Sequence, residues 1–273
     1  MVGILDLDPI VHIVANVQYA KGNRDDEQGV RNHVRSFLLQ VQASSKCTEF
    51  LMFYQGKGFD NFRNVILPEY KSHRTPSDGI LMWKPAIMEE LKELGCIPLK
   101  YIESDDAMAL CATRYDLDEF LLVTGDKDAD QVQGMHYNPF KGGWNQEQRW
   151  NHVTEDDANL FLYCQLIAGD PTDIPGEFAG IPGMGMKKAL KYLNNYRPED
   201  YKKAVSKLYL SKFPKEEAIN KFTTTYRMVK MLSPDEVSKF GADVESECNK
   251  VLTLKPTKYA NQSEDLFNDL FDS

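Results

Sequence analysis

The first 153 residues alternate between short apolar runs and longer amphipathic segments. The apolar runs are rich in Ile, Leu, Val, Phe and Tyr, which is typical of buried strands, and they cover residues 2–7, 49–54, 97–102 and 119–124. Helical periodicity lies between them, over about 28–42, 85–94 and 105–115. Strands that alternate with helices indicate an α/β fold, so we predict a central, mostly parallel sheet flanked by helices.

The pattern becomes purely helical after Thr154. Thr154 and Asp157 form a capping-box pattern, and the apolar helix that follows ends at Gly169. A loop rich in Gly and Pro spans 171–183, and further helices are predicted from about 184, near 199–210 and over 214–230. We therefore divide the chain into a core (1–153), a helical subdomain (154–232) and a polar, weakly periodic C-terminal extension (233–273) that we expect to be partly disordered.

Composition places the protein among soluble intracellular proteins. The chain of 273 residues is 42% apolar but has no apolar run of about 18 residues and no basic-then-apolar signal at its N-terminus, so we expect a cytoplasmic protein without a membrane segment. Its five cysteines are scattered without a C-x-x-C pair and are interpreted as reduced thiols. The histidines lack the spacing of a zinc site.

The net charge of −9 does not exclude nucleic acid as a partner, because much of it comes from eight clustered acids. These acids are Asp6, Glu103, Asp105, Asp106, Asp126, Asp128, Asp170 and Asp173. Three of the clusters follow predicted strands, and the carboxyl ends of parallel strands meet at one edge of a sheet. We therefore expect the acids to converge, where they stay ionised together only beside divalent cations.

Ligands made only of oxygen favour Mg²⁺ or Mn²⁺. Two such ions about 3.5–4 Å apart clamp a phosphodiester and activate a water. We predict Asp6, Glu103, Asp105, Asp126 and Asp128 as direct or bridging ligands, and Asp106, Asp170 and Asp173 as ligands of the second metal or of its outer shell. Taken singly, E-S-D-D is an ordinary helix start and G-D-P-T-D an ordinary turn; the combination favours a metal site.

Two basic segments fit phosphate. Residues 67–74 (L-P-E-Y-K-S-H-R) bring Tyr70, Lys71 and Arg74 together, and the two cations suit a scissile phosphate, although a solvated loop is the simpler alternative. Residues 75–85 are a candidate arch or lid.

Residues 180–190 (G-I-P-G-M-G-M-K-K-A-L) place Gly183 and Gly185 before a helix whose lysines are Lys187, Lys188 and Lys191. The backbone N–H groups at such a helix start can bind a phosphate, and the lysines add positive charge. The segment lacks the G-K-[ST] sequence of a P-loop, so we do not expect it to bind a nucleotide triphosphate. A plain Gly-rich turn is the alternative.

Taken together, these strings resemble the 5′-nucleases of the flap-endonuclease superfamily, especially the 5′→3′ exonucleases of bacteriophages and the 5′-nuclease domain of bacterial DNA polymerase I. The matching strings are L-D-L-D (5–8), F-R-N-V-I-L-P-E-Y-K-S-H-R (62–74), E-S-D-D-A-M-A (103–109), T-G-D-K-D-A-D-Q (124–131) and G-D-P-T-D-I-P-G…G-I-P-G-M-G-M-K-K-A (169–189). They span about residues 1–200. The resemblance implies a PIN-like nuclease core with a helical arch over the site at about 71–97. It also implies a helix–three-turn–helix element at about 169–192 that grips duplex DNA and holds K⁺.

It also implies a Mg²⁺-dependent, structure-specific 5′→3′ exonuclease or flap endonuclease that acts as a monomer. The expected substrates are DNA with 5′ ends, flaps or nicks, or RNA–DNA hybrids. The expected role is in replication, in the cytoplasm of a cell or phage host. Lys71 and Arg74 match the family's catalytic cations, and Tyr70 matches an aromatic residue near the reacting nucleotide. A PIN-like ribonuclease and a non-catalytic DNA-structure-binding protein remain alternatives.

The chain departs from the family pattern at two positions. Gln55 stands where relatives carry an acid after the second strand, so that one ligand is missing or Asp60 replaces it. His12 stands where relatives stack an aromatic side chain on a base, and it is either a DNA contact or a packed helix residue. The tail carries Leu266, Phe267, Leu270 and Phe271 at helical spacing among acids, which suits a groove on a replication protein; docking on its own domain is the alternative.

Overall fold

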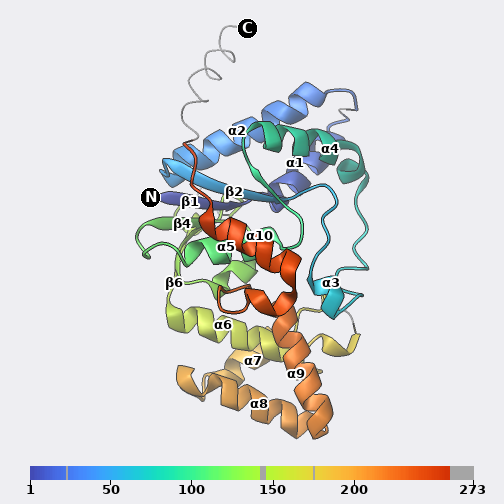
Figure 1. Cartoon of the computed structure of the whole chain (residues 1–273), viewed down its shortest axis with the longest axis vertical. Helices are drawn as coiled ribbons and strands as arrows, with labels where there is room; N and C mark the ends of the chain where they lie inside the picture. The colour runs from blue at the N-terminus through green and yellow to red at the C-terminus, as the bar shows by residue number, and fades with distance from the viewer. Residues whose placement is uncertain (23, 142–145, 175, 259–273) are drawn as a thin grey trace.

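A computed structural model of the chain describes residues 1–22, 24–141, 146–174 and 176–258 (Figure 1). Its centre is a six-stranded sheet of order β3-β2-β1-β4-β5-β6. The strands are β1 (Val2–Asp6), β2 (Glu49–Gln55), β3 (Ile97–Leu99), β4 (Phe120–Val123), β5 (Gly134–Tyr137) and β6 (Trp150–Val153). All neighbours are parallel except β5 and β6. The predicted α/β class is confirmed, although the sequence pattern missed the last two strands.

Helices cover both faces of the sheet (Figure 1). One face packs on α1 (Asp8–Ala20), α2 (Glu27–Ser45) and α4 (Asp78–Glu93), and the other on α5 (Ser104–Ala112) and α10 (Ala242–Thr253). Successive strand residues point to opposite faces, so Leu5 enters the first core and Ile4 the second. Both cores are apolar, which fixes the strand register and holds the strand ends in place.

Helix α4 begins earlier than its periodicity predicts. Its first residue is Asp78, because the Ser77 side chain caps the helix by accepting a hydrogen bond from the Ile80 N–H (3.3 Å). The helix continues through Pro85 and packs against α1, burying Ile80 and Trp83. The segment 75–85, expected as an arch or lid, is helical from Asp78 onward and packs on α1, and residues 71–77 connect it to α3 (Arg63–Ile66) and the turn that follows.

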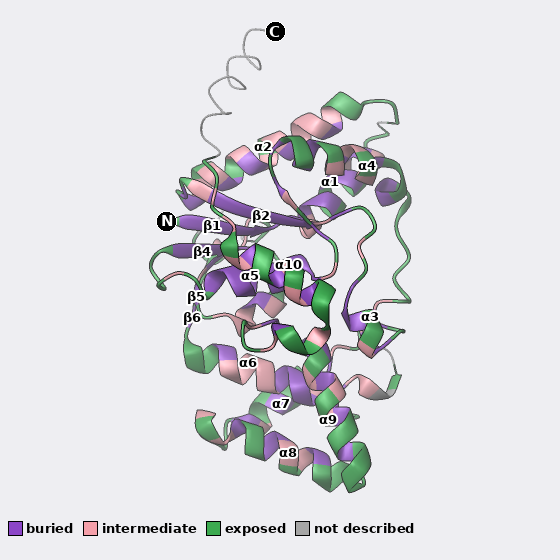
Figure 2. Cartoon of the chain, in the orientation of Figure 1, coloured by how far each residue is buried: buried purple, intermediate pink, exposed green. Residues whose placement is uncertain are grey.

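The helical subdomain has a core of its own, built from α6 (Glu155–Ala168), α7 (Met186–Leu193), α8 (Tyr201–Lys212) and α9 (Lys215–Val229). The capping box of Thr154 and Asp157 begins α6, and Gly169 ends it, as the sequence predicts. Buried residues alternate with exposed ones along these helices (Figure 2). The subdomain lies beyond the β6 edge of the sheet, next to the strand ends that carry the acids (Figure 1).

The C-terminal extension is ordered where the structure describes it. Helix α10 packs on α5 through Val244, Cys248 and Val251, so the partial disorder expected for 233–273 does not include this helix. The hydrophobic tail positions Leu266, Phe267, Leu270 and Phe271 lie outside the described residues. Among the helices of the described ranges, none combines the length and apolar character that crossing a bilayer requires.

Candidate metal and phosphate site

Seven of the eight predicted acids line two adjoining hollows at the carboxyl edge of the sheet. The larger one, a groove of about 640 Å³, contains Asp6, Glu103, Asp105 and Asp126. The smaller one shares Glu103 and Asp105 with it and adds the acids of the other clusters, which are Asp128, Asp170 and Asp173. Asp6 ends β1, Glu103 follows β3, and Asp126 follows β4, so the parallel sheet brings together acids that are far apart in sequence.

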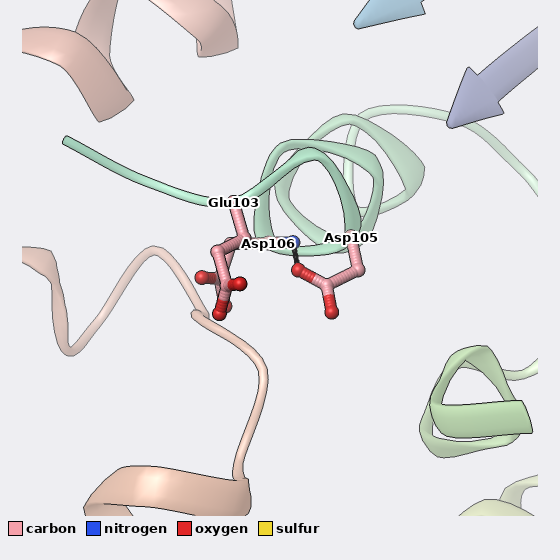
Figure 3. Close-up of side chains that lie close together, drawn as sticks. All are labelled: Glu103, Asp105 and Asp106. Atoms are coloured by element: carbon pink, nitrogen blue, oxygen red, sulfur yellow. Dashed lines mark hydrogen bonds between the residues drawn. The ribbon is translucent and has the colours of Figure 1, made fainter. Parts of the chain in front are cut away.

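Glu103, Asp105 and Asp106 form the tightest acid group, with one oxygen of each within 4.8 Å of the others (Figure 3). All three lie at the start of α5, where the helix dipole favours negative charge. Figure 3 shows the three carboxylates projecting from the same turn, with the Asp105 carboxylate turned back to accept a hydrogen bond from the Asp106 N–H (2.7 Å).

Asp106 lies beneath the hollows. Its carboxylate accepts hydrogen bonds from the buried Arg63 (Nη2, 2.9 Å) and from the Leu232 N–H (3.0 Å). Arg63 also donates to Glu103 (3.2 Å). Of the two roles predicted for Asp106, these contacts favour the outer shell, because both of its oxygens already hold protein groups. Sequence reasoning assigned Arg63 no role, although it stands in the matching string that begins F-R at Phe62.

Glu103 is held ionised by cations. Burial raises the pKa of its carboxyl, but Lys71 and Arg63 more than offset this effect and lower that pKa to about 2. The Tyr70 hydroxyl donates to the same carboxylate (2.9 Å), and burial together with Glu103 raises the pKa of Tyr70. Lys71 contacts Glu103 directly and lies 3.5 Å from Asp173. The predicted phosphate-binding cation therefore sits among the predicted metal ligands.

In three other acids, burial and neighbouring acids outweigh any nearby cation. Burial raises the pKa of Asp6, with Asp8 and Asp126 adding to the shift. Burial raises the pKa of Asp105, and repulsion from Asp106 and Glu103 adds a smaller shift in the same direction. Burial also raises the pKa of Asp128, and repulsion from Asp126 adds to it. Buried carboxylates that repel one another are stabilised by a divalent cation. Their oxygen-only donor set fits Mg²⁺ or Mn²⁺.

Lys71 and Arg74 are placed by an unusual backbone. Lys71 has a φ of 56°, a left-handed conformation that is rare for a residue with a side chain, and its N–H donates to the Asp173 carbonyl (2.9 Å). Arg74 reaches the Asp173 carboxylate from the same turn. Strained backbone of this kind persists where the surrounding structure holds it, often at functional sites. Here it directs both cations over the acid edge.

The predicted glycine loop and lysine helix form a separate surface next to this edge. Gly185 precedes the first residue of α7, Gly183 has a φ of 76°, and its carbonyl accepts a hydrogen bond from the Lys188 ammonium (2.7 Å). Lys187 and Lys191 are exposed on α7. The loop is held against the acid edge by a close backbone contact, since a Cβ on Gly169 would lie 1.8 Å from the Ala179 carbonyl oxygen.

His12 lines the larger groove on α1. Partial burial, Lys84 and Arg74 lower its pKa, so the ring is neutral at pH 7. Lys84 lines the same groove and was not among the predicted site residues. The groove thus has an acidic floor at the strand ends and basic groups on α4 and the 71–77 segment, an arrangement suited to a phosphate bound to cations.

Sequence reasoning also missed a chain of amides. The buried Gln165 donates to Asp128 (2.7 Å) and accepts from Gln131 (2.7 Å), which in turn donates to the Val229 carbonyl (2.7 Å). The chain connects α6 and α9 to the acid that follows β4. Spacing in the sequence could not reveal it, because its members come from three distant elements.

Comparison with known proteins relates the chain to nucleases. Residues 15–158, more than half of the chain, match the family model described as 5′-3′ exonuclease, N-terminal resolvase-like domain. The flap endonuclease Xni of Shewanella loihica is 23% identical over 204 residues, which are 68% of this chain and 74% of that protein. A 5′-3′ exonuclease of Buchnera aphidicola is 28% identical over 145 residues, which cover 50% of this chain and 49% of that one.

Solved structures show the same fold. The 5′-exonuclease of bacteriophage T5 with bound zinc superposes with a TM-score of 0.62 at 17% identity, covering 92% of this chain and 98% of that one. The T5 D15 flap endonuclease, in a pseudo-enzyme-product complex with DNA and metal ions, superposes with a TM-score of 0.56 at 17% identity and the same coverage. At this identity the likeness concerns the fold, and the site has to be judged from the residues of this chain.

Proposed function

The chain belongs to the 5′-3′ exonuclease family, and we propose that it is a structure-specific nuclease that hydrolyses DNA phosphodiesters at 5′ ends, flaps or nicks and releases 5′-phosphate products. The observation that carries this proposal is the gathering of Asp6, Glu103 and Asp126 from three strand ends at one groove, with Lys71 beside them. Acids and phosphate-binding cations on one groove suit a phosphodiester substrate.

The acids fit two divalent ions, Mg²⁺ with Mn²⁺ as a substitute. Asp6, Glu103, Asp105, Asp126 and Asp128 face the hollows with oxygen donors, and Asp170 and Asp173 flank them. Bound ions of this class neutralise the phosphate and lower the pKa of a coordinated water. Lys71 and Arg74 lie where they can orient the scissile phosphate, and the Tyr70 hydroxyl holds Glu103 in place.

Duplex DNA is proposed to bind beside the acid edge, on the loop 179–185 and helix α7. Lys187 and Lys191 supply exposed positive charge, and a hollow of about 320 Å³ lined by Gly180, Gly183 and Gly185 leaves backbone groups accessible for a phosphate or a K⁺ ion. We also propose that the protein acts on RNA–DNA hybrids, that it is a monomer, and that it serves replication. A phage origin and a cytoplasmic location are part of the same proposal. A replication partner for the tail stays a prediction.

A cleavage assay tests the proposal. Flap, nicked and blunt DNA and single-stranded RNA, each labelled at the 5′ end, are incubated with the protein and Mg²⁺ or with EDTA. We expect cleavage of the flap or nicked DNA that EDTA abolishes, because the buried acids repel one another and need divalent cations to stay ionised together. Cleavage of RNA alone would favour the ribonuclease alternative, and binding of DNA without cleavage would favour the non-catalytic one.

The variant Asp128→Asn tests the site assignment in the same assay. The amide keeps the shape and the contact with Gln165 but loses the charge, so we expect cleavage to fall by at least about 100-fold while DNA binding in EDTA is unchanged. Wild-type cleavage by this variant would contradict the site assignment.

A further inference from the structure

The end of β2 lacks the acid that its neighbours in the sheet carry. Strand β2 lies between β3 and β1 in the sheet, and the acids of those two strands, Glu103 and Asp6, both line the groove. β2 ends in Gln55, whose amide side chain is neutral. Asp60, the nearest acid downstream, is exposed and is not among the described residues that line the groove. The sheet edge therefore has a gap in its row of charges between β1 and β3.

Asp8 fills this gap from another direction. It is the first residue of α1, and its carboxylate accepts hydrogen bonds from the Gln55 N–H (2.9 Å) and from the Ser104 hydroxyl (2.7 Å). The first contact places the carboxylate over the end of β2, and the second places it beside Glu103. Asp8 lines the same groove as Asp6 and Glu103.

An ordinary role at the start of a helix does not account for these contacts. Acids are favoured in the first turn of a helix because they face its free N–H groups. The hydrogen bonds from the Gln55 N–H and the Ser104 hydroxyl join Asp8 to β2 and α5, and the start of α1 has no side-chain cap. Each carboxylate oxygen has two acceptor directions, so Asp8 keeps capacity toward the groove after making both bonds.

We propose that Asp8 supplies the carboxylate that is missing from the end of β2, and that it completes the set of acids around a divalent cation between Asp6 and Glu103. This inference rests on the proposed function, because it concerns the same site. Asp8 begins the helix that follows β1, and its contact with the Gln55 N–H brings its negative charge to the end of β2.

Binding of Mn²⁺ to the DNA-free protein tests the inference. Free Mn²⁺ is measured by electron paramagnetic resonance for wild type, Asp8→Asn and the matched control Asp60→Asn. We expect Asp8→Asn to weaken Mn²⁺ binding by about 10- to 100-fold, as for other groups that hold or support a metal, and Asp60→Asn to bind like wild type. A melting temperature in EDTA is recorded for each variant. Unchanged Mn²⁺ affinity in Asp8→Asn overturns the inference, whether or not the melting temperature falls.

A relocated charge gives the second test. In the double variant Asp8→Asn, Gln55→Asp, the acid returns to the end of β2, and we expect Mn²⁺ affinity to recover relative to Asp8→Asn alone. No recovery in a folded double variant contradicts the idea that the charge, rather than the anchoring of α1, is what matters. These readouts are independent of cleavage: wild type that binds Mn²⁺ but cuts no substrate refutes the proposed function and leaves the Asp8 result standing.

Discussion

Two carboxyl groups at this edge of the sheet, those of Glu103 and Asp6, have pKa values that are shifted in opposite directions. Glu103 is paired with Lys71 and Arg63, and its pKa falls to about 2. Asp6 is buried next to Asp8 and Asp126, and its pKa is raised. In the first case folding favours the ionised group, whereas in the second it favours the protonated one. The difference follows from which residues carry a cationic neighbour, and it predicts how the metal-free protein responds to pH.

We predict that lowering the pH from 7.5 to 5.5 in EDTA raises the melting temperature, and that Asp6→Asn raises it at pH 7.5. A group whose pKa is higher in the folded protein than its unfolded value of about 3.9 binds protons more tightly when folded, so its contribution to stability is lost as pH rises through the folded pKa. Glu103 acts in the reverse sense, but only as pH falls below about 4.3 toward its folded pKa, outside this range. Inside the range, His12 and His33 oppose the effect, because burial lowers their pKa values and folding then disfavours their protonated forms. Four carboxyl groups with raised pKa values, those of Asp6, Asp8, Asp105 and Asp128, outweigh these two imidazoles.

Differential scanning calorimetry checks this prediction, with Mn²⁺ as the internal control. Bound cations take over the role of the protons, so in Mn²⁺ the melting temperature of wild type should lose this pH dependence. A metal-free melting temperature that falls between pH 7.5 and 5.5, with Asp6→Asn no more stable than wild type at pH 7.5, contradicts the prediction.

Among the elements, helix α7 is positioned by contacts of the loop that precedes it. The loop before it is fixed by the Ile181 N–H, which donates to the Ile167 carbonyl (2.8 Å), and by the contact between Gly169 and Ala179. Both contacts tie the loop to the end of α6, next to Asp170. The lysines of α7 are therefore held at a fixed distance from the acid edge, as the proposed binding of duplex DNA requires.

We predict that Lys187→Ala with Lys191→Ala weakens duplex binding and lowers the slope of log affinity against log salt concentration by about 2, because two phosphate contacts are lost. Both side chains are exposed, so the melting temperature should stay within about 2 °C of wild type. Fluorescence anisotropy with a labelled nicked duplex in EDTA measures the slope. The pair Lys92→Ala with Lys250→Ala, on α4 and α10, serves as the control. An equal change in both double variants would show that only net charge matters.

For the whole molecule, the C-terminal helix closes the face of the sheet that carries α5. The carboxylate of Glu247 on α10 accepts hydrogen bonds from three consecutive N–H groups, those of Lys100 (2.7 Å), Tyr101 (2.7 Å) and Ile102 (3.0 Å). This segment leads directly into Glu103. A residue near the end of the described chain therefore helps to position an acid of the site.

We predict that Glu247→Ala lowers the melting temperature and reduces cleavage, whereas Glu245→Ala on the same helix changes neither. Leaving part-buried N–H groups unsatisfied costs about 1–3 kcal/mol each, and water can replace part of the loss at this partly exposed position. Thermal unfolding and the flap-cleavage assay measure the two effects. Wild-type stability in Glu247→Ala would show that α10 is held by its apolar contacts alone.

The sequence by itself determined the parts of this protein that depend on local pattern. Alternating strands and helices predicted the α/β fold, and the capping box of Thr154 and Asp157 located the start of α6. The convergence of Asp6, Glu103 and Asp126 was also predictable, because the carboxyl ends of parallel strands share one edge regardless of how the helices pack.

Only the tertiary structure decided which acids face the groove and which are neutralised beneath it. Asp105 and Asp106 are adjacent in sequence, yet one lines the hollows while the other pairs with Arg63, 43 positions away in the chain. Asp8, which resembles a simple helix start, and α10, which stands in a polar stretch of the sequence, likewise make their contacts with distant partners. Burial and charge pairing arise from packing between elements, and the spacing of residues along the chain does not record them.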